Sequence, residues 1–183
     1  NADALSIASI AAVKGMPILL SNLNQLPEET AAYLEEIQAG LTQSYVIGGE
    51  ALLSSKVQEA VPGKTDRIYG KDRFETNLKV LQAFYADVTS FEKVYIANGM
   101  NDHLVDALVA SSLAASTNSP IVLVNKVFDN DTKNYVEGKL SVTGKIIALG
   151  GESVVSSSVQ TANVVRAQDF GVMTSSGVNG YSV

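Results

Sequence analysis

The feature that most constrains the fold of this sequence is an internal repeat. The stretch YVIGGEALLSS, Tyr45–Ser55, returns in the second half as IALGGESVVSS, Ile147–Ser157. Likewise ADALSIASIAA, Ala2–Ala12, returns as VDALVASSLAA, Val105–Ala115. Because the matching stretches keep one order in both halves, the chain is an array of one structural unit, and each matched loop belongs to the architecture of that unit.

Each copy alternates helices with short apolar strands. Ala2–Val13 has apolar residues at helical spacing and a glycine just beyond it, which predicts a helix. Met16–Leu20 is a short continuous apolar run, typical of a buried strand. A helix opened by Pro27, a strand at Ser44–Ile47 and a short helix at Ser54–Ala60 complete the first copy.

The middle of the chain has no counterpart in the first half. It predicts a strand at Asp66–Tyr69, a helix at Arg73–Tyr85 and a strand at Lys93–Ala97. The second copy then repeats helix, strand, helix, strand and helix from Asp102 to about Val164. Helices alternating with strands that are apolar on both faces predict an α/β fold, with a parallel sheet flanked by helices.

These elements divide the chain into two units and a tail. We assign residues 1–63 to a partial unit that lacks its opening strand, helix and strand, and residues 64–164 to a complete unit. Residues 165–183 form a C-terminal tail. The tail only weakly resembles the start of another unit, through Arg166 and Asp169, and is not counted as one.

Composition excludes several classes of site and partner. The chain has no cysteine and one histidine, His103, so disulfides, thiolate zinc sites and cysteine nucleophiles are ruled out. A net charge of −6 argues against binding to nucleic acid or to an anionic membrane surface. No apolar run approaches the roughly 18 residues of a membrane-spanning helix. We predict no cofactor and no metal site.

The two glycine pairs, Gly48-Gly49 and Gly150-Gly151, are the first candidate ligand contacts. Glycine at the end of a strand lets backbone N–H groups approach a phosphate, with the following helix dipole adding attraction. The same glycines are needed wherever the backbone takes a positive φ or lies close to a neighbouring strand. The pairs lack the spacing of a dinucleotide site and the lysine of a P-loop.

A basic cluster, Lys64, Arg67, Lys71 and Arg73, is the second candidate. Arginine forks bind phosphate oxygens through paired charge-assisted hydrogen bonds, so a phosphodiester polymer would suit them. Alternatively these side chains pair internally with nearby acids and fix the loop. Asp72 is a plausible N-cap of the following helix, in which case an arginine could still face outward.

Two aspartates, Asp3 and Asp106, occupy the same position in the two copies. An acid at a helix start is stabilised by the helix dipole, and it can also pair with an arginine of a neighbouring unit. A catalytic carboxylate pair would need both in one pocket. The catalytic serine pattern G-x-S-x-G is absent, and the sequence shows no general base for the serines that follow the glycine loops. We therefore predict no catalytic residue.

Several quoted stretches, taken in order, resemble the type 2 cell wall-binding repeat of Gram-positive surface and S-layer proteins. They are RIYGKDRFETN (Arg67–Asn77), NDHLVDALVASSLAA, SPIVLVN and ALGGESVVSSSV. The resemblance implies tandem Toprim-like or flavodoxin-like units that hold a secreted surface protein on the cell wall. The implied ligand is an anionic wall polysaccharide or teichoic-acid-like polymer, bound between units, and the implied partners are neighbouring units or a second copy.

Two alternatives remain open at this point. The chain could be an α/β enzyme acting on phosphate esters or nucleotides through the glycine loops and Glu50 or Glu152. Such an enzyme would depend strictly on a metal cation. It could also be a purely structural S-layer assembly unit, with Arg67 and Arg73 buried in salt bridges.

Overall fold

The computed structural model describes residues 2–125, 127–156, 159 and 164–166, and it has the expected α/β architecture. Its strands form two parallel sheets. The smaller sheet pairs β1 (Gln43–Ile47) with β2 (Lys64–Ile68). The larger has the order β4-β3-β5-β6, formed by Ile121–Val124, Phe91–Asn98, Leu140–Ala148 and Val164–Arg166.

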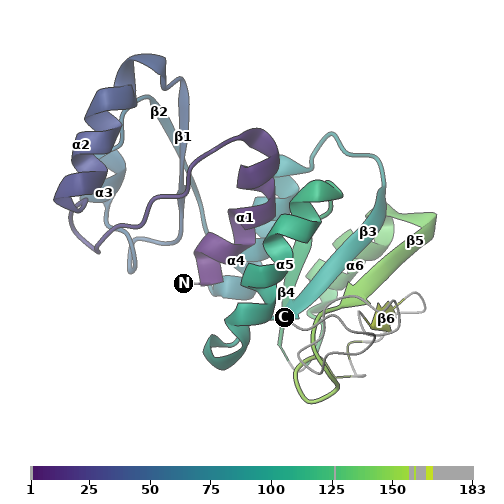
Figure 1. Ribbon diagram of the computed structural model, residues 1–183. Coiled ribbons are helices and arrows are strands. Elements are labelled where there is room, and N and C mark those ends of the chain that lie inside the picture. The colour runs from purple at the N-terminus through teal and green to yellow at the C-terminus, as the bar shows by residue number, and fades with distance from the viewer. Residues whose placement is uncertain (1, 126, 157–158, 160–163, 167–183) are drawn as a thin grey trace, which may run out of the picture.

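Helices flank both sheets (Figure 1). The β1–β2 pair lies with α2 (Glu28–Ile37) and α3 (Ser55–Ala60), apart from the larger sheet. Three helices gather beside the larger sheet, namely α1 (Ala2–Lys14), α4 (Arg73–Phe84) and α5 (Leu104–Ser116). The remaining helix is α6 (Asn130–Lys139), and two short 3-10 turns are η1 (Gln38–Gly40) and η2 (Asn101–His103).

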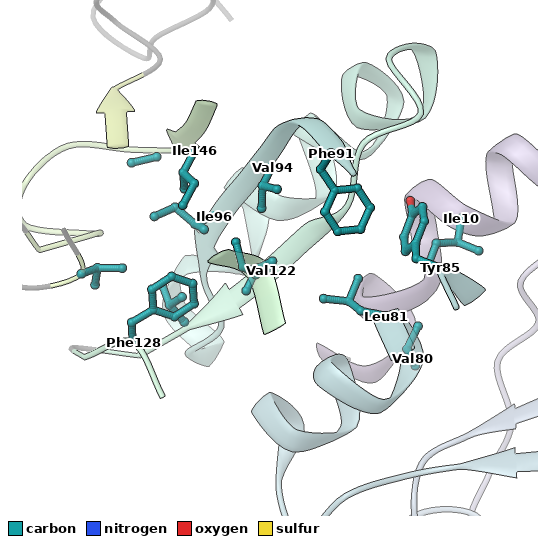
Figure 2. Close-up of a cluster of buried hydrophobic side chains, with 14 of the residues drawn as sticks. Ile10, Val80, Leu81, Tyr85, Phe91, Val94, Ile96, Val122, Phe128 and Ile146 are labelled. Carbon is teal, nitrogen blue, oxygen red and sulfur yellow. The ribbon is translucent and has the colours of Figure 1, made fainter. Parts of the chain in front are cut away.

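The core lies on both faces of the larger sheet, because alternate strand residues point to opposite faces. One face presents Val94, Ile96, Val122 and Ile146 to α4 and α6 (Figure 2). The other face presents a separate cluster, made of Tyr95, Ala97, Ile121, Leu123 and Ile147 with the alanines of α5 and with Ala2. Strands buried on both faces explain the continuous apolar runs of the sequence.

Polar side chains fix the ends and edges of these elements. Asp72 accepts hydrogen bonds from the backbone N–H groups of Phe74 and Glu75, and so caps α4 as predicted. The wholly buried Asn77 donates to Ile121 O at 3.1 Å and accepts from Leu123 N at 2.9 Å. Its amide therefore pairs with the outer edge of β4 and ties α4 to the sheet.

The predicted strand at Met16–Leu20 is wrong. This segment forms no helix and belongs to neither sheet, and Ile18, Leu19 and Leu20 are 42, 40 and 58 % exposed. Its counterpart in the second half forms the buried strand β4, which pairs with β3. The physical reason is the lack of a pairing partner. Among the described residues no strand pairs with Met16–Leu20, and a single strand without a partner has no ladder hydrogen bonds to stabilise it.

The strands pair across the unit boundary that the sequence predicts at residues 63–64. β2, which opens the second unit in the sequence, pairs with β1 of the first, so that Val46 lies opposite Arg67. In the second half β6 pairs with β5 in the matching register, with Ala148 opposite Arg166. The three described residues of β6 therefore occupy the place of an opening strand of a further unit, which the sequence signal alone did not establish.

Candidate ligand site at the carboxyl ends of the strands

The two glycine loops have the same construction. Gly48 and Gly150 follow β1 and β5 with φ values of 130° and 92°, which favour glycine. In the first loop Leu52 N donates to Gly49 O, and in the second Val154 N donates to Gly151 O. Gly48 and Gly150 are therefore required by the turn itself. Residues 157–158 and 160–163 lie outside the described residues, and with them most of the helix predicted after the second loop.

Each helix aspartate lies against the glycine loop of its own unit. A Cβ added to Gly48 would lie 3.4 Å from Asp3 Oδ2, and one added to Gly150 would lie 3.0 Å from Asp106 Oδ2. Burial raises the pKa of Asp3, although the Arg73 guanidinium acts in the opposite direction. The Arg73 guanidinium therefore attracts the Asp3 carboxylate, and an ion pair between the two predicted units stays a prediction.

Arg67 is directed into the first glycine loop. Its Nη1 donates to Gly48 O and to Leu53 O, both at 2.8 Å, and its Nη2 donates to Ser54 O at 3.2 Å. Its Nε donates to Gln58 Oε1 at 2.8 Å. Four of the five guanidinium hydrogens are thus directed at oxygens of the loop and of α3. This environment favours a scaffolding role for Arg67, and ligand contact by this residue stays a prediction.

Arg73 has a different environment. Its Nη1 donates to Gly99 O at 2.8 Å and to Asn101 Oδ1 at 2.7 Å, which ties α4 to the loop after β3. Within the described residues Nε and Nη2 make no hydrogen bond and no ion pair. Since one guanidinium nitrogen fixes the side chain, an edge of the fork is left to bind an anion.

The residues around Arg73 are mostly exposed. Lys71 is exposed, and its backbone N–H donates to Glu75 Oε2 at 2.8 Å. This bond and the neighbouring Lys79 hold the pKa of Glu75 below its usual value. The Asp72 carboxylate is committed to the helix cap, so a direct ligand contact by Asp72, like those by Lys71 and the glycines, stays a prediction.

Tyr69 belongs to this region and was not among the residues predicted from the sequence. It follows β2, is 50 % exposed and lies over Gly49, where an added Cβ would be 3.4 Å from its ring. Lys79 Nζ lies 5.8 Å from the centre of the ring, within range of a cation–π contact. An aromatic residue inside the basic stretch RIYGKDR was the available signal.

In the described part of the chain, no group of three or more His, Cys, Asp or Glu side chains is placed to hold a metal ion. Glu50 is exposed beside the first loop, and His103 is half-buried in η2. Among the described helices, none has both the length and the apolar character needed to cross a membrane.

The fold and this region define a tandem α/β repeat in which loops at the strand ends of successive units meet. Family comparison identifies the repeat: residues 1–58 and 67–160 match the model of Cell wall binding domain 2 (CWB2). The chain belongs to this family of Gram-positive surface proteins, is a cell wall-binding module, and acts at the cell wall or cell surface.

Two named relatives from one organism are similar to parts of this chain. The chain is similar to N-acetylmuramoyl-L-alanine amidase LytC of Bacillus subtilis (strain 168), with 28 % identity over 68 % of this chain and 23 % of the relative. It is 29 % identical to the amidase enhancer of that organism, over 68 % of this chain and 16 % of the relative. The chain thus spans less than a quarter of each.

Solved structures share the fold. Cwp6 from Clostridium difficile superposes with a TM-score of 0.74 and 29 % identity, covering 90 % of this chain and 27 % of Cwp6. Cwp8 from Clostridium difficile gives a TM-score of 0.70 and 28 % identity, covering 86 % of this chain and 26 % of Cwp8.

Proposed function

We propose that this chain is a non-catalytic anchoring module that binds an anionic secondary wall polymer and so holds a surface protein on the cell wall. The observation that carries the proposal is Arg73, fixed through one nitrogen while Nε and Nη2 make no hydrogen bond within the described residues. A phosphate or carboxylate of a wall polymer fits that edge as a paired, charge-assisted contact.

The surroundings of Arg73 supply the rest of the site. Exposed Lys71 adds a positive charge on the same loop. Tyr69 offers an apolar ring face of the kind on which sugar rings pack, beside Gly49. Arg67 supports the site from beneath by fixing the loop that carries Gly48 and Gly49. Although the chain has a net charge of −6, Lys71 and Arg73 make the charge around this site locally positive, which favours an anionic ligand.

Association with a further unit is part of this proposal. Val105, Leu108 and Val109 form an apolar stripe on α5 and are 66, 58 and 39 % exposed. Their counterparts on α1 are Ala2, Leu5 and Ser6, of which Ala2 and Leu5 pack against the cluster that contains α5. The stripe therefore suits the helix of a neighbouring unit or of a second copy.

The proposal is tested by co-sedimentation with bacterial wall sacculi, before and after their anionic polymers are stripped. We expect binding only to intact sacculi, weakened by salt and reduced at least tenfold in a Lys71→Ala/Arg73→Ala variant. Lys93→Ala/Lys133→Ala is the matched control, because it removes the same charge from exposed or half-exposed positions elsewhere. Equal binding by both variants, or equal binding to stripped sacculi, would refute the proposed site.

A further inference from the structure

The loop that follows β3 is fixed from three directions. Because β3 lies between β4 and β5 in the sheet, its last residue, Asn98, comes between the loops that follow those two strands. Gly99 N donates to the last carbonyl of β4 at 2.8 Å, and Gly99 O accepts from Arg73 Nη1 at 2.8 Å. Asn98 Nδ2 donates to Val154 O, in the second glycine loop, at 2.7 Å. The loop after β3 therefore connects β4, α4 and the second glycine loop.

The side chain that makes the last of these connections is the amide of Asn98, which is 7 % exposed. Its Oδ1 accepts from Met100 N at 2.8 Å, while its Nδ2 donates to Val154 O. Closing the turn at Met100 needs only an acceptor, which serine, threonine or aspartate would also supply. The donor is a property of the amide, and it contacts a residue 56 positions further along the chain. Asn98 thus does more than close its own turn.

Close packing on the other side of this loop carries its position to Arg73. A Cβ added to Gly99 would lie 2.8 Å from Phe74 Cε1 and 3.2 Å from Leu123 Cβ, so the backbone has little room to move toward α4 or β4. Arg73 Nη1 also donates to Asn101 Oδ1 at 2.7 Å. Since both acceptors of Arg73 Nη1 belong to the loop after β3, the position of the guanidinium follows the position of that loop.

We propose that Asn98 is a positioning residue, which ties the loop after β3 to Val154 O and so holds Arg73 in place for an anionic ligand. This inference rests on the proposed function, in which Arg73 binds the anion. It adds a coupling: Arg73 and the second glycine loop move together, although the hydrogen bonds of Arg73 end on Gly99 and Asn101.

The coupling is tested first without any ligand, by amide hydrogen exchange followed by NMR. In the second glycine loop Val154 N and Val155 N both donate to Gly151 O at 3.0 Å, so their exchange reports how firmly that loop is held. We expect exchange of both amides to accelerate roughly tenfold in Arg73→Ala. The same acceleration is expected in Asn98→Ser, because a serine keeps an acceptor for the turn but is too short to reach the second glycine loop.

The first glycine loop supplies the matched reference. The amides of Leu52 and Leu53 donate to Gly49 O in the same arrangement, but that loop is fixed by Arg67. Their exchange should therefore stay at the parent rate in the serine variant. Unchanged exchange of the second loop in Arg73→Ala, or equal acceleration of both loops in the serine variant, overturns the coupling.

Binding to intact sacculi then tests the positioning role. Asn98→Ser should bind roughly fivefold more weakly than the parent chain, because Arg73 is held less firmly. Tyr135→Phe is the control, since it removes one half-buried hydrogen bond, to Leu81 O, at the opposite end of α4, and it should bind as the parent does. Equal binding by the two variants overturns the positioning role. If the parent chain itself does not bind, the proposed function fails and the positioning role with it, while the exchange result still decides the coupling.

Discussion

Replacing Arg67 with alanine should destabilise the protein strongly, because this side chain holds a whole loop. The change deletes four hydrogen bonds, three to carbonyls of the glycine loop and one to Gln58. A charged hydrogen bond contributes about 1.5–3 kcal/mol. The four are not additive, because one half-buried side chain makes them all and water can reach part of the loop once it is gone.

We therefore expect a loss of about 3 kcal/mol for Arg67→Ala, the scale of a broken buried network. For a chain of this length that corresponds to a fall in Tm of roughly 6–12 °C. Chemical denaturation, followed by circular dichroism, measures the free energy of unfolding directly. Arg73→Ala removes two hydrogen bonds and should cost about half as much.

The outcome separates a scaffold from a ligand contact. The scaffolding argument is refuted if the free energy of unfolding of Arg67→Ala lies within about 0.5 kcal/mol of the parent value and the variant no longer binds sacculi. Arg67 would then contact the ligand itself. Arg67→Lys is the informative companion, because a lysine keeps the charge but offers a point donor in place of a fork. On the scaffolding argument it recovers only part of the lost stability.

Three further predictions test the loops, the sheet edge and a buried tyrosine. Gly150→Ala should cost about 1–3 kcal/mol through strain at positive φ and contact with Asp106, whereas Gly151→Ala, with open space around it, should lie within about 0.5 kcal/mol of the parent in urea unfolding. Asn77→Ala should cost about 2–3 kcal/mol, because it leaves the backbone of β4 unpaired in a buried place; thermal unfolding measures it. Burial raises the pKa of Tyr85 to about 12, above the ordinary tyrosine value of 10.0. Folding thus favours the neutral phenol. The contribution of Tyr85 to the free energy of unfolding is intact below pH 10 and is lost as the pH rises from about 10 to 12. Ultraviolet titration should show delayed ionisation of this tyrosine, and a Tyr85→Phe variant lacking the delayed step identifies it.

Much of the fold could be predicted because its signals are local. Short continuous apolar runs predicted β1, β3, β4 and β5, and Asp72 marked the start of α4 correctly. Among the described residues, a strand predicted from apolar composition is wrong at Met16–Leu20, where no other strand pairs with the segment. Strand formation depends on a partner, and no local pattern contains that information. The same limit applies to β6, whose three residues are too few to give a periodic signal.

The candidate site was harder to predict because its parts depend on direction as well as on position. Sequence grouped Arg67 and Arg73 as equivalent cations, but they lie at different places relative to the turn after β2. Arg67, on the strand, points back to Gly48, while Arg73, on the helix, reaches Gly99. The charge pattern alone does not distinguish a guanidinium with most of its N–H groups hydrogen-bonded inside the protein, as in Arg67, from one whose Nε and Nη2 make no such bond within the described residues, as in Arg73.

The origin of Arg67 explains why successive units depend on each other. It lies on β2, which opens the second unit in the sequence, yet it fixes the loop that ends β1 of the first. The matching backbone register of β6 with β5 places a following strand beside the second loop in the same way. The loop after β1 thus owes its shape to the strand of the next unit. A ligand that contacts this loop therefore depends on two adjoining units. An isolated unit would have the residues of the loop but would lack the strand that fixes its conformation.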